Sequence, residues 1–131
     1  MRKMLIVLAI VMSFAMAATA FAGSSAPNLT GKWKGKMQIH DKTRGFVADE
    51  VVTMVITEQK DLVFYGEKAW TQNGKEVKEA FSGVITPDGD IYLAEEVDGV
   101  TIGKHKNGAI TFYYLEGGPT RMAIVQEFVK Q

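Results

Sequence analysis

The stretch LVFYGEKAWTQNGKEVKEAFSGVITPDGDIYL, residues 62–93, carries the strongest evidence for the fold. Two runs rich in β-branched and aromatic residues flank Asn73-Gly74, a pair that tolerates positive φ at both positions and suits a two-residue type I′ loop. This loop places Phe64 opposite Gly83 and Gly66 opposite Phe81, so that each ring covers the bare backbone of a glycine. The stretch therefore predicts an antiparallel hairpin with these residues on its inward face.

The inward face of this hairpin contains one charged pair. The same register sets Lys68 opposite Glu79, which predicts a cross-strand ion pair worth less than about 1 kcal/mol. At Pro87-Asp88-Gly89 a three-residue loop fits, because Pro opens a type I turn and Gly takes the left-handed position. Gly83 then meets Leu93, and the inward face continues into the next strand.

Turn signals recur at nearly even spacing along the rest of the chain. They are Asp41 to Gly45, Gln59 to Asp61, Asn73-Gly74, Pro87-Asp88-Gly89, Asp98-Gly99, Asn107-Gly108 and Gly117-Gly118-Pro119. Even spacing of short strands predicts an antiparallel barrel or sandwich. Because only tight turns join the eight segments, we predict an all-β fold, an eight-stranded antiparallel up-and-down barrel with no open edge.

The inward face of the fifth to seventh strands depends on the turn at Asp98-Gly99. A two-residue turn there places four residues inside and five outside, and a single bulge would reverse both sets. The inside set is Glu95, Ile102, Lys104 and Tyr113, and the outside set is Tyr92, His105, Ile110, Phe112 and Tyr114. An apolar outer wall of this kind predicts a homodimer through Tyr92, Ile110, Phe112 and Tyr114. The alternative is a bulge that turns the wall inward and leaves a monomer.

The N-terminal stretch MRKMLIVLAIVMSFAMAATAFA, residues 1–22, has the three parts of a secretory signal peptide. A basic start precedes an apolar run, and small residues follow, so we predict cleavage after Ala22, with Ala20 as the nearest alternative. A membrane anchor is the competing interpretation, but the apolar run is short for a span. The signal is of bacterial type and predicts a periplasmic or extracellular location.

The remaining chain has the length and composition of one domain. We predict a flexible lead-in over residues 23–30 and a single barrel domain over residues 31–131. The 131-residue chain has no cysteine, so disulfides and cysteine lipidation are excluded. Its formal net charge is 0, which becomes −2 once Arg2 and Lys3 are removed, and this near-neutral charge gives no reason to expect nucleic acid as a partner.

Small exported barrels of eight meandering strands that open with Gly-x-Trp are typical of the calycin superfamily. Through Gly31-Lys32-Trp33 and the hairpin series, the chain resembles lipocalin-like and avidin-like members of it. The resemblance implies that Gly31 and Trp33 belong to a plug at one end of the barrel, with Lys130 on the last strand as the basic partner of the Trp. It also implies a fold built to hold a small ligand.

The chain departs from the avidin and lipocalin patterns in several ways. The Asn that contacts biotin two residues after the avidin Trp is replaced here by Gly35, and the chain has only 2 Trp for a cage. Biotin is therefore disfavoured. The chain is also shorter than a typical lipocalin and shows no C-terminal helix pattern, which argues against a roomy lipocalin pocket.

Motifs for catalysis or metal binding are weak. His40 and His105 lack spaced partners for a metal site, Asp88-Gly89-Asp90 lacks the further ligands of a calcium loop, and Ser82 has no triad companions. Glu50, Glu79 and Glu95 would have displaced pKa values only if they faced inward. We predict no enzymatic activity, no metal and no cofactor.

We predict an exported barrel that binds a small, mostly apolar molecule in the barrel or at its mouth. The candidate ligand-binding residues are Met54, Phe64, Lys68, Trp70, Glu79, Phe81 and Leu93, with Lys68 and Glu79 as polar groups. The alternative is a protein-interaction module, such as an exported inhibitor or an envelope partner, with a filled interior. A cavity above about 300 Å³ would favour the first function and a filled barrel the second.

Overall fold

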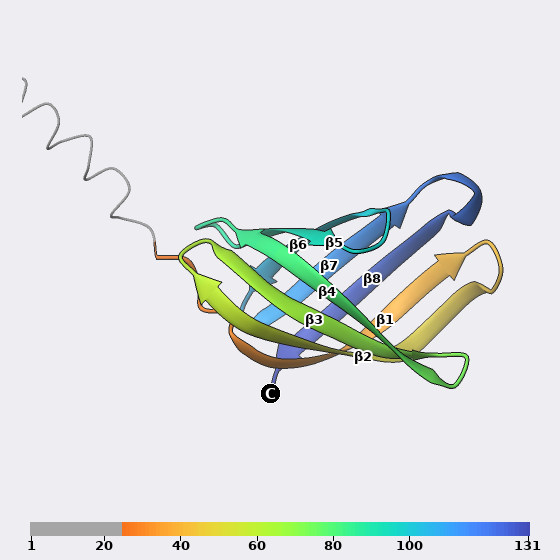
Figure 1. Ribbon diagram of the computed structural model, residues 1–131, viewed down its shortest axis with the longest axis horizontal. Coiled ribbons are helices and arrows are strands. Elements are labelled where there is room, and N and C mark those ends of the chain that lie inside the picture. Colours follow the sequence, from red (N-terminus) through yellow and green to blue (C-terminus); the bar gives the residue numbers. More distant parts are fainter. Residues whose placement is uncertain (1–24) are drawn as a thin grey trace, which may run out of the picture.

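The barrel closes through pairing of its first and last strands. The computed structural model describes residues 25–131; the predicted signal peptide and its cleavage site lie outside the described residues. Each of the eight strands pairs antiparallel with the next one along the chain, and β8 pairs with β1 (Figure 1). The predicted all-β, up-and-down barrel is confirmed.

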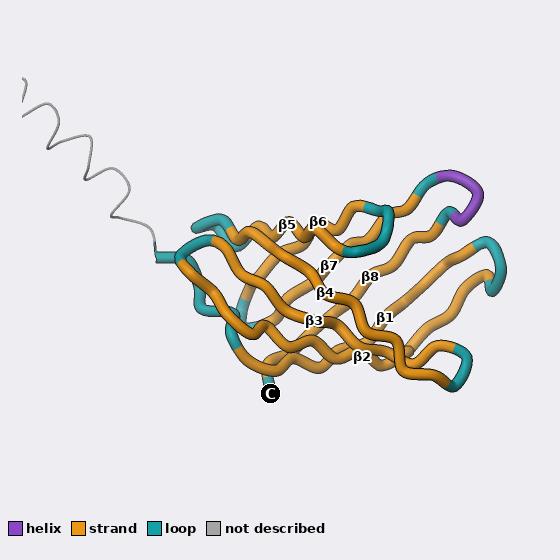
Figure 2. The backbone as a smooth tube through the Cα atoms, viewed as in Figure 1, coloured by secondary structure: helices purple, strands orange, loops and turns teal. Residues whose placement is uncertain are grey.

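Strands occupy most of the described chain, with short connections between them (Figure 2). Their bounds are β1 Gly31–Asp41, β2 Gly45–Lys60, β3 Val63–Gln72, β4 Lys75–Ile85, β5 Asp90–Glu95, β6 Val100–Lys106, β7 Ala109–Glu116 and β8 Met122–Lys130. A 3-10 turn, η2 (Gly118–Thr120), lies between β7 and β8. Within residues 25–131, no helix has the length and apolar character needed to cross a membrane.

Two Asn-Gly pairs form the tight hairpin turns that the sequence predicts. Asn73 and Gly74 have φ values of 51° and 72°, and Asn107 and Gly108 have 53° and 75°. Positive φ at both positions is the signature of a type I′ turn, whose twist matches that of the flanking strands. These turns fix the β3–β4 and β6–β7 registers.

The β3–β4 register is the predicted one. Phe64 pairs with Gly83, Gly66 with Phe81, and Lys68 lies opposite Glu79. A Cβ atom added at Gly83 would lie 2.3 Å from Cζ of Phe64, and one added at Gly66 would lie 2.8 Å from Cζ of Phe81. Only glycine therefore allows these rings to lie flat against the opposite strand.

The prediction for β6 and β7 is wrong because the β5–β6 connection is longer than a two-residue turn. Strand β5 ends at Glu95 and β6 begins at Val100, and Leu93 pairs with Thr101 where a turn at Asp98-Gly99 would set it against Lys104. The register thus moves by three residues. An odd displacement exchanges the two faces of every following strand.

The exchange reverses the faces of most residues assigned to β6 and β7. Ile102, Lys104 and Tyr113, expected inside, are exposed, whereas Ile110, Phe112 and Tyr114, expected outside, are buried. His105 also turns inward, and its ring meets Trp33. Glu95 and Tyr92 keep their predicted sides.

The same change of face removes most of the predicted homodimer surface from the outer wall. Of its four residues, Ile110, Phe112 and Tyr114 belong to the barrel interior, and Tyr92 alone stays on the outer wall. These four residues therefore do not form a common surface. Three of the four residues turn inward, as the alternative predicts, but the cause is the longer β5–β6 connection and not a bulge.

The lead-in was predicted to be flexible, but its described part packs on the barrel. Leu29 is fully buried, and Ala26 lies against the core. The Leu29 N–H donates to Oε1 of Gln59 at 2.8 Å, and Nε2 of Gln59 donates to the Pro27 carbonyl at 2.9 Å. Residues 25–30 therefore form a cap over one end of the barrel.

Candidate functional site

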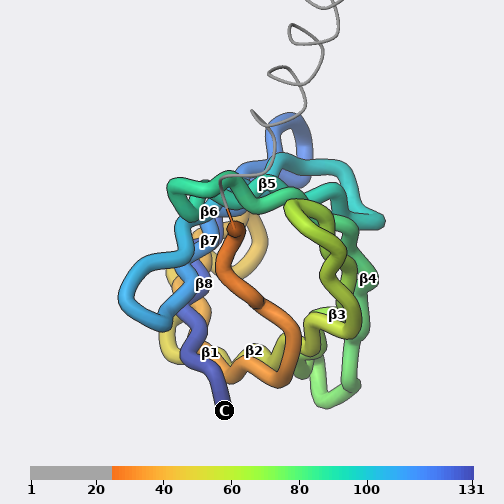
Figure 3. Tube along the Cα trace, turned by 90° about the vertical axis from the view of Figure 1, so that its left-hand side faces the viewer, coloured from red at the N-terminus to blue at the C-terminus, as the bar shows by residue number. Residues whose placement is uncertain are grey.

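One end of the barrel is closed around Trp33. The indole N–H donates to the Leu29 carbonyl at 2.9 Å, and Nζ of Lys130 lies 5.7 Å from the centroid of the ring. Gly31 lies against Lys130, where an added Cβ would come within 3.0 Å of the lysine Cε. The structure thus brings together all three residues of the predicted plug. Figure 3 shows residues 25–30 crossing this end.

The half of the barrel next to the plug is filled with side chains. The rings of Phe64 and Phe81 meet edge to face with centroids 6.2 Å apart, and those of Phe112 and Phe128 do so at 5.9 Å. Three predicted ligand-binding residues, Met54, Phe64 and Phe81, belong to the packed core, and a fourth, Leu93, packs against it. They stabilise the barrel and do not line the cavity described below.

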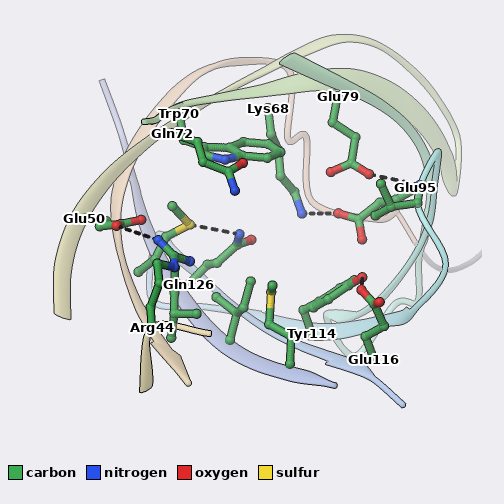
Figure 4. Close-up of a pocket in the computed structure, with 15 residues that line it drawn as sticks. Arg44, Glu50, Lys68, Trp70, Gln72, Glu79, Glu95, Tyr114, Glu116 and Gln126 are labelled. Carbon is green, nitrogen blue, oxygen red and sulfur yellow. Dashed lines mark hydrogen bonds and ion pairs between the residues drawn. The ribbon is translucent and has the colours of Figure 1, made fainter. Parts of the chain in front are cut away.

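A cavity of about 170 Å³ lies in the half of the barrel that is farther from Trp33. We call this part of the barrel the open end. Its lining residues come from the late parts of β1, β3, β5 and β7 and the early parts of β2, β4 and β8. They are Met37, Ile39, Arg44, Glu50, Lys68, Trp70, Gln72, Glu79, Glu95, Val97, Tyr114, Glu116, Met122, Ile124 and Gln126 (Figure 4). Of the predicted ligand-binding residues, Lys68, Trp70 and Glu79 line it.

The polar side of the cavity is organised by Lys68, whose side chain is 2% exposed. Its ammonium pairs with Glu95, on β5, and the hydroxyl of Thr101 donates to the second carboxylate oxygen of Glu95. The ammonium also lies 5.1 Å from the centroid of Phe112. The predicted Lys68–Glu79 ion pair is wrong, because Lys68 pairs with Glu95, which lies opposite Phe81 in the β4–β5 register.

Glu79 is nearly buried but has few partners. Its Oε1 accepts the backbone N–H of Val97 at 3.2 Å, and the structure shows no cation paired with it among residues 25–131. Burial raises the pKa of the Glu79 carboxyl above its ordinary value, and the nearby charge of Glu95 raises it further. The cavity therefore holds a carboxyl group that is poorly solvated and free to take a donor.

Tyr114 lines the cavity next to the acidic residue Glu116. Its hydroxyl lies 2.7 Å from both the Asp98 carbonyl and Oε2 of Glu116, so its single proton serves one of the two acceptors at a time. Burial raises the pKa of the Tyr114 hydroxyl well above its ordinary range. Hydrogen bonds from Thr120 and then from Tyr114 lower the pKa of Glu116, which stays ionised.

Arg44 holds the rim of the open end together. Its Nε contacts Oδ2 of Asp41 at 2.7 Å and its Nη1 contacts Oε1 of Glu50 at 3.1 Å. The backbone N–H of Arg44, and next its side chain, lower the pKa of Asp41. The charge of Arg44 is thus already matched by carboxylates within the protein.

Gln126 leaves one buried polar atom without a partner. Its Nε2 donates to Sδ of Met37 at 3.5 Å, whereas its Oε1 is buried and accepts no hydrogen bond from the described residues. Figure 4 shows the Gln126 amide projecting from β8 into the cavity. An unmatched buried carbonyl costs about 1–3 kcal/mol, so a donor that enters the cavity would be stabilised there.

Several lining residues were missed by the sequence analysis. Gln126, Ile124 and Met122 alternate on β8 with a period of two, and this alternation could have placed them inside. Tyr114 was assigned to the wrong face through the β5–β6 connection. No motif marked the set, because its members come from seven different strands and two turns.

The groups around the cavity are carboxylates, amides, an ammonium, a guanidinium and a phenol, set among apolar side chains. In the part of the chain that the structure describes, no group of three or more His, Cys, Asp or Glu residues is arranged to hold a metal ion. A scan against protein-family models, a search of curated proteins and a search of solved structures each find no match. The calycin resemblance accordingly stays a prediction, and the fold defines the chain as an eight-stranded up-and-down barrel.

Proposed function

We propose that the protein is an exported, non-enzymatic barrel that binds a small, mostly apolar molecule at its open end. The observation that carries this proposal is the asymmetry of the interior. Trp33 and the cap of residues 25–30 close one end, while the other end keeps a cavity walled on one side by Met37, Ile39 and Ile124. A barrel evolved only for stability has no need of such a void, since empty space in a core is destabilising.

The volume sets the size of the ligand. An apolar cavity of about 150 Å³ can hold a benzene molecule, whereas sites for drug-sized ligands measure about 300–1,000 Å³. A cavity of about 170 Å³ suits one ring or a short chain. A longer ligand would extend past the rim at Arg44 and Glu50.

Export rests on the sequence of residues 1–22 and is part of the same proposal. A periplasmic or extracellular barrel meets small molecules that enter from the surroundings of the cell. Its lack of disulfides agrees with a fold held by its packed half and its closed sheet.

A protein-interaction module is the second candidate, and a separate observation favours it. The cavity is smaller than a usual ligand site, and an apolar row crosses the outer wall from β3 to β7 along paired positions. Its members, each 42–57% exposed, are Val63, Val84, Tyr92, Ile102 and Tyr113. A row of this kind is typical of surfaces that meet another protein.

Native mass spectrometry of protein purified from its own host tests the first proposal. We expect an adduct whose mass corresponds to a molecule of about one ring or a short chain, and we expect Ile124→Phe, which fills the cavity, to abolish it. Ala123→Phe, the neighbouring outward position on β8, is the matched control and should retain the adduct. An adduct-free wild-type protein that also binds no benzene-sized probe would favour the interaction module.

A further inference from the structure

We propose that the ligand carries a positively charged amino group beside its apolar body, and that Glu79 and Gln126 receive this group. The inference rests on the proposed ligand-binding function and specifies the class of ligand. It follows from two independent features of the cavity, its unmatched negative charge and its unmatched hydrogen-bond acceptors.

The charges that line the cavity are unequal. Four carboxyl groups, from Glu50, Glu79, Glu95 and Glu116, face two cations, Arg44 and Lys68. Arg44 is paired with Glu50 and Lys68 with Glu95. This leaves Glu79 and Glu116 without a cation among the described residues, and Glu116 already accepts the hydroxyls of Tyr114 and Thr120. Glu79, which accepts one backbone N–H, is the carboxyl with capacity for a ligand.

The cavity wall also contains a buried hydrogen-bond acceptor without a donor. Oε1 of Gln126 accepts nothing from the described chain, although the residue is only 5% exposed. Figure 4 shows Gln126 and Glu79 on different walls of the cavity, with the side chain of Lys68 between them and the Trp70 ring beside Lys68. An ammonium group has three donors and no acceptor, so it suits oxygens that lack a donor, and an aromatic face attracts a cation further.

Other ligand chemistries fit these groups less well. An anion would be repelled by the acidic lining, and Lys68, the cation that it would need, is already held by Glu95 and Phe112. A neutral alcohol can donate to Gln126 but cannot balance the charge of Glu79. A water molecule likewise satisfies a carbonyl without neutralising a carboxylate. The amine is the class that meets both needs at once.

Three single-ring probes of similar size separate these classes: benzylamine, benzyl alcohol and benzoate. Each has a single ring of the size that the cavity admits, and the three differ in the charge of one group. Affinity is measured by calorimetry, and the site by the two indole ¹H–¹⁵N signals, since Trp70 lines the cavity and Trp33 lies at the closed end. We expect benzylamine to bind about tenfold more tightly than benzyl alcohol, as for one charge-assisted hydrogen bond. Benzoate should bind most weakly, and the Trp70 signal alone should shift.

Two variants and a control assign the preference to residues. Glu79→Gln keeps the shape of the side chain and should reduce the preference for benzylamine over benzyl alcohol to less than about twofold. Gln126→Met should weaken the binding of benzylamine and of benzyl alcohol, which both donate hydrogen bonds, and should leave the affinity for benzoate unchanged. Glu76→Gln removes a carboxylate from the outer face of the same strand, β4, and should leave all three affinities as in the wild type.

The outcomes distinguish this inference from the proposed function. If no probe shifts the Trp70 signal, both the ligand-binding function and this inference are overturned. If the three probes bind equally, or benzoate binds best, the ligand-binding function stands and the amine inference is overturned. A benzylamine preference that survives in Glu79→Gln would overturn the assignment of the cation to Glu79.

Discussion

Lys68 forms its ion pair with Glu95, 27 residues away in the sequence, although Glu79 stands directly opposite Lys68 in the β3–β4 register. Glu79, the direct cross-strand neighbour of Lys68, is therefore the carboxylate left without a cation among the described residues. This arrangement contributes to the acidic character of the cavity, and burial, followed by the charge of Glu95, raises the pKa of Glu79. It also makes the contributions of the three residues experimentally separable.

Removal of the Lys68 charge should destabilise the barrel strongly. Lys68→Met leaves Glu95 buried without its cation, and breaking a buried pair in this way costs about 3–5 kcal/mol. Adding Glu95→Gln to Lys68→Met should recover most of that loss, because neither position of the former ion pair then carries a charge. Urea denaturation gives the free energies of unfolding. Lys78→Met, which removes only exposed ion pairs, is the control and should change the free energy by less than about 1 kcal/mol.

Glu79 should make the free energy of unfolding depend on pH. The folded protein holds the Glu79 proton more tightly than the unfolded chain, whose carboxyl has an ordinary pKa of 4.5. Protonation therefore favours folding, and this contribution is fully present below about pH 4.5 and lost as the pH rises through the raised pKa. Glu79→Gln should thus stabilise the protein at pH 8 and have little effect at pH 4. An equal effect at both pH values would contradict the raised pKa.

Trp33 should be the most costly aromatic side chain to remove at the closed end. It is 2% exposed, and its indole N–H is hydrogen-bonded to Leu29. Trp33→Ala should lower the free energy of unfolding by about 3–5 kcal/mol, as for other large buried rings. Tyr92→Ala, on the outer wall, is the control and should cost less than about 1 kcal/mol. A loss of similar size at both positions would mean that Trp33 does not act as a plug.

A pair of neighbouring substitutions tests the face of β7. Phe112 is fully buried and Tyr113 is 48% exposed. Phe112→Glu should prevent folding, because it buries a carboxylate without a partner, whereas Tyr113→Glu should fold with nearly normal stability. Circular dichroism and thermal melting of the two variants decide the matter. The opposite result would restore the face predicted from a two-residue turn at Asp98-Gly99.

The glycines that face aromatic rings should not tolerate a side chain. A Cβ at Gly83 would lie 2.3 Å from Phe64, and one at Gly66 would lie 2.1 Å from the Val55 carbonyl oxygen. Gly83→Val and Gly66→Val should each cost about 1–3 kcal/mol or more. Ala80→Val, on the exposed face of β4, should be nearly neutral or slightly stabilising, because valine favours strands. Chemical denaturation of the three variants provides the comparison.

The β3–β4 hairpin could be predicted in detail because its signals are local. Asn73-Gly74 specifies the turn, and the large and small residues opposite each other confirm the register. The β5–β6 connection could not be predicted in the same way. Asp98-Gly99 resembles a two-residue turn in sequence, but Asp98 is not among the residues with positive φ, and the connection spans residues 96–99.

The cavity was harder to predict than the barrel. The period-two alternation of the β3–β4 hairpin was enough to predict that three lining residues face inward. They are Trp70, Lys68 and Glu79. The partner of Lys68 lies two strands away, on β5, so the pairing of β3 with β4 alone does not reveal it. The inward position of Tyr114 depends on the length of the β5–β6 connection. Because that connection was predicted as a two-residue turn, Tyr114 was not predicted to line the cavity.

Pairing of β1 with β8 brings the two ends of the described chain to the closed end of the barrel. Gln131 donates its backbone N–H to the Lys32 carbonyl at 2.9 Å, and residues 25–30 cross the same end (Figure 3). A fluorophore or surface linker attached after Gln131 therefore points away from the cavity mouth. The protein can be immobilised through this end with its rim facing the solution. The hairpin turn at Asn73-Gly74, at the other end, offers a place to open a circularly permuted chain.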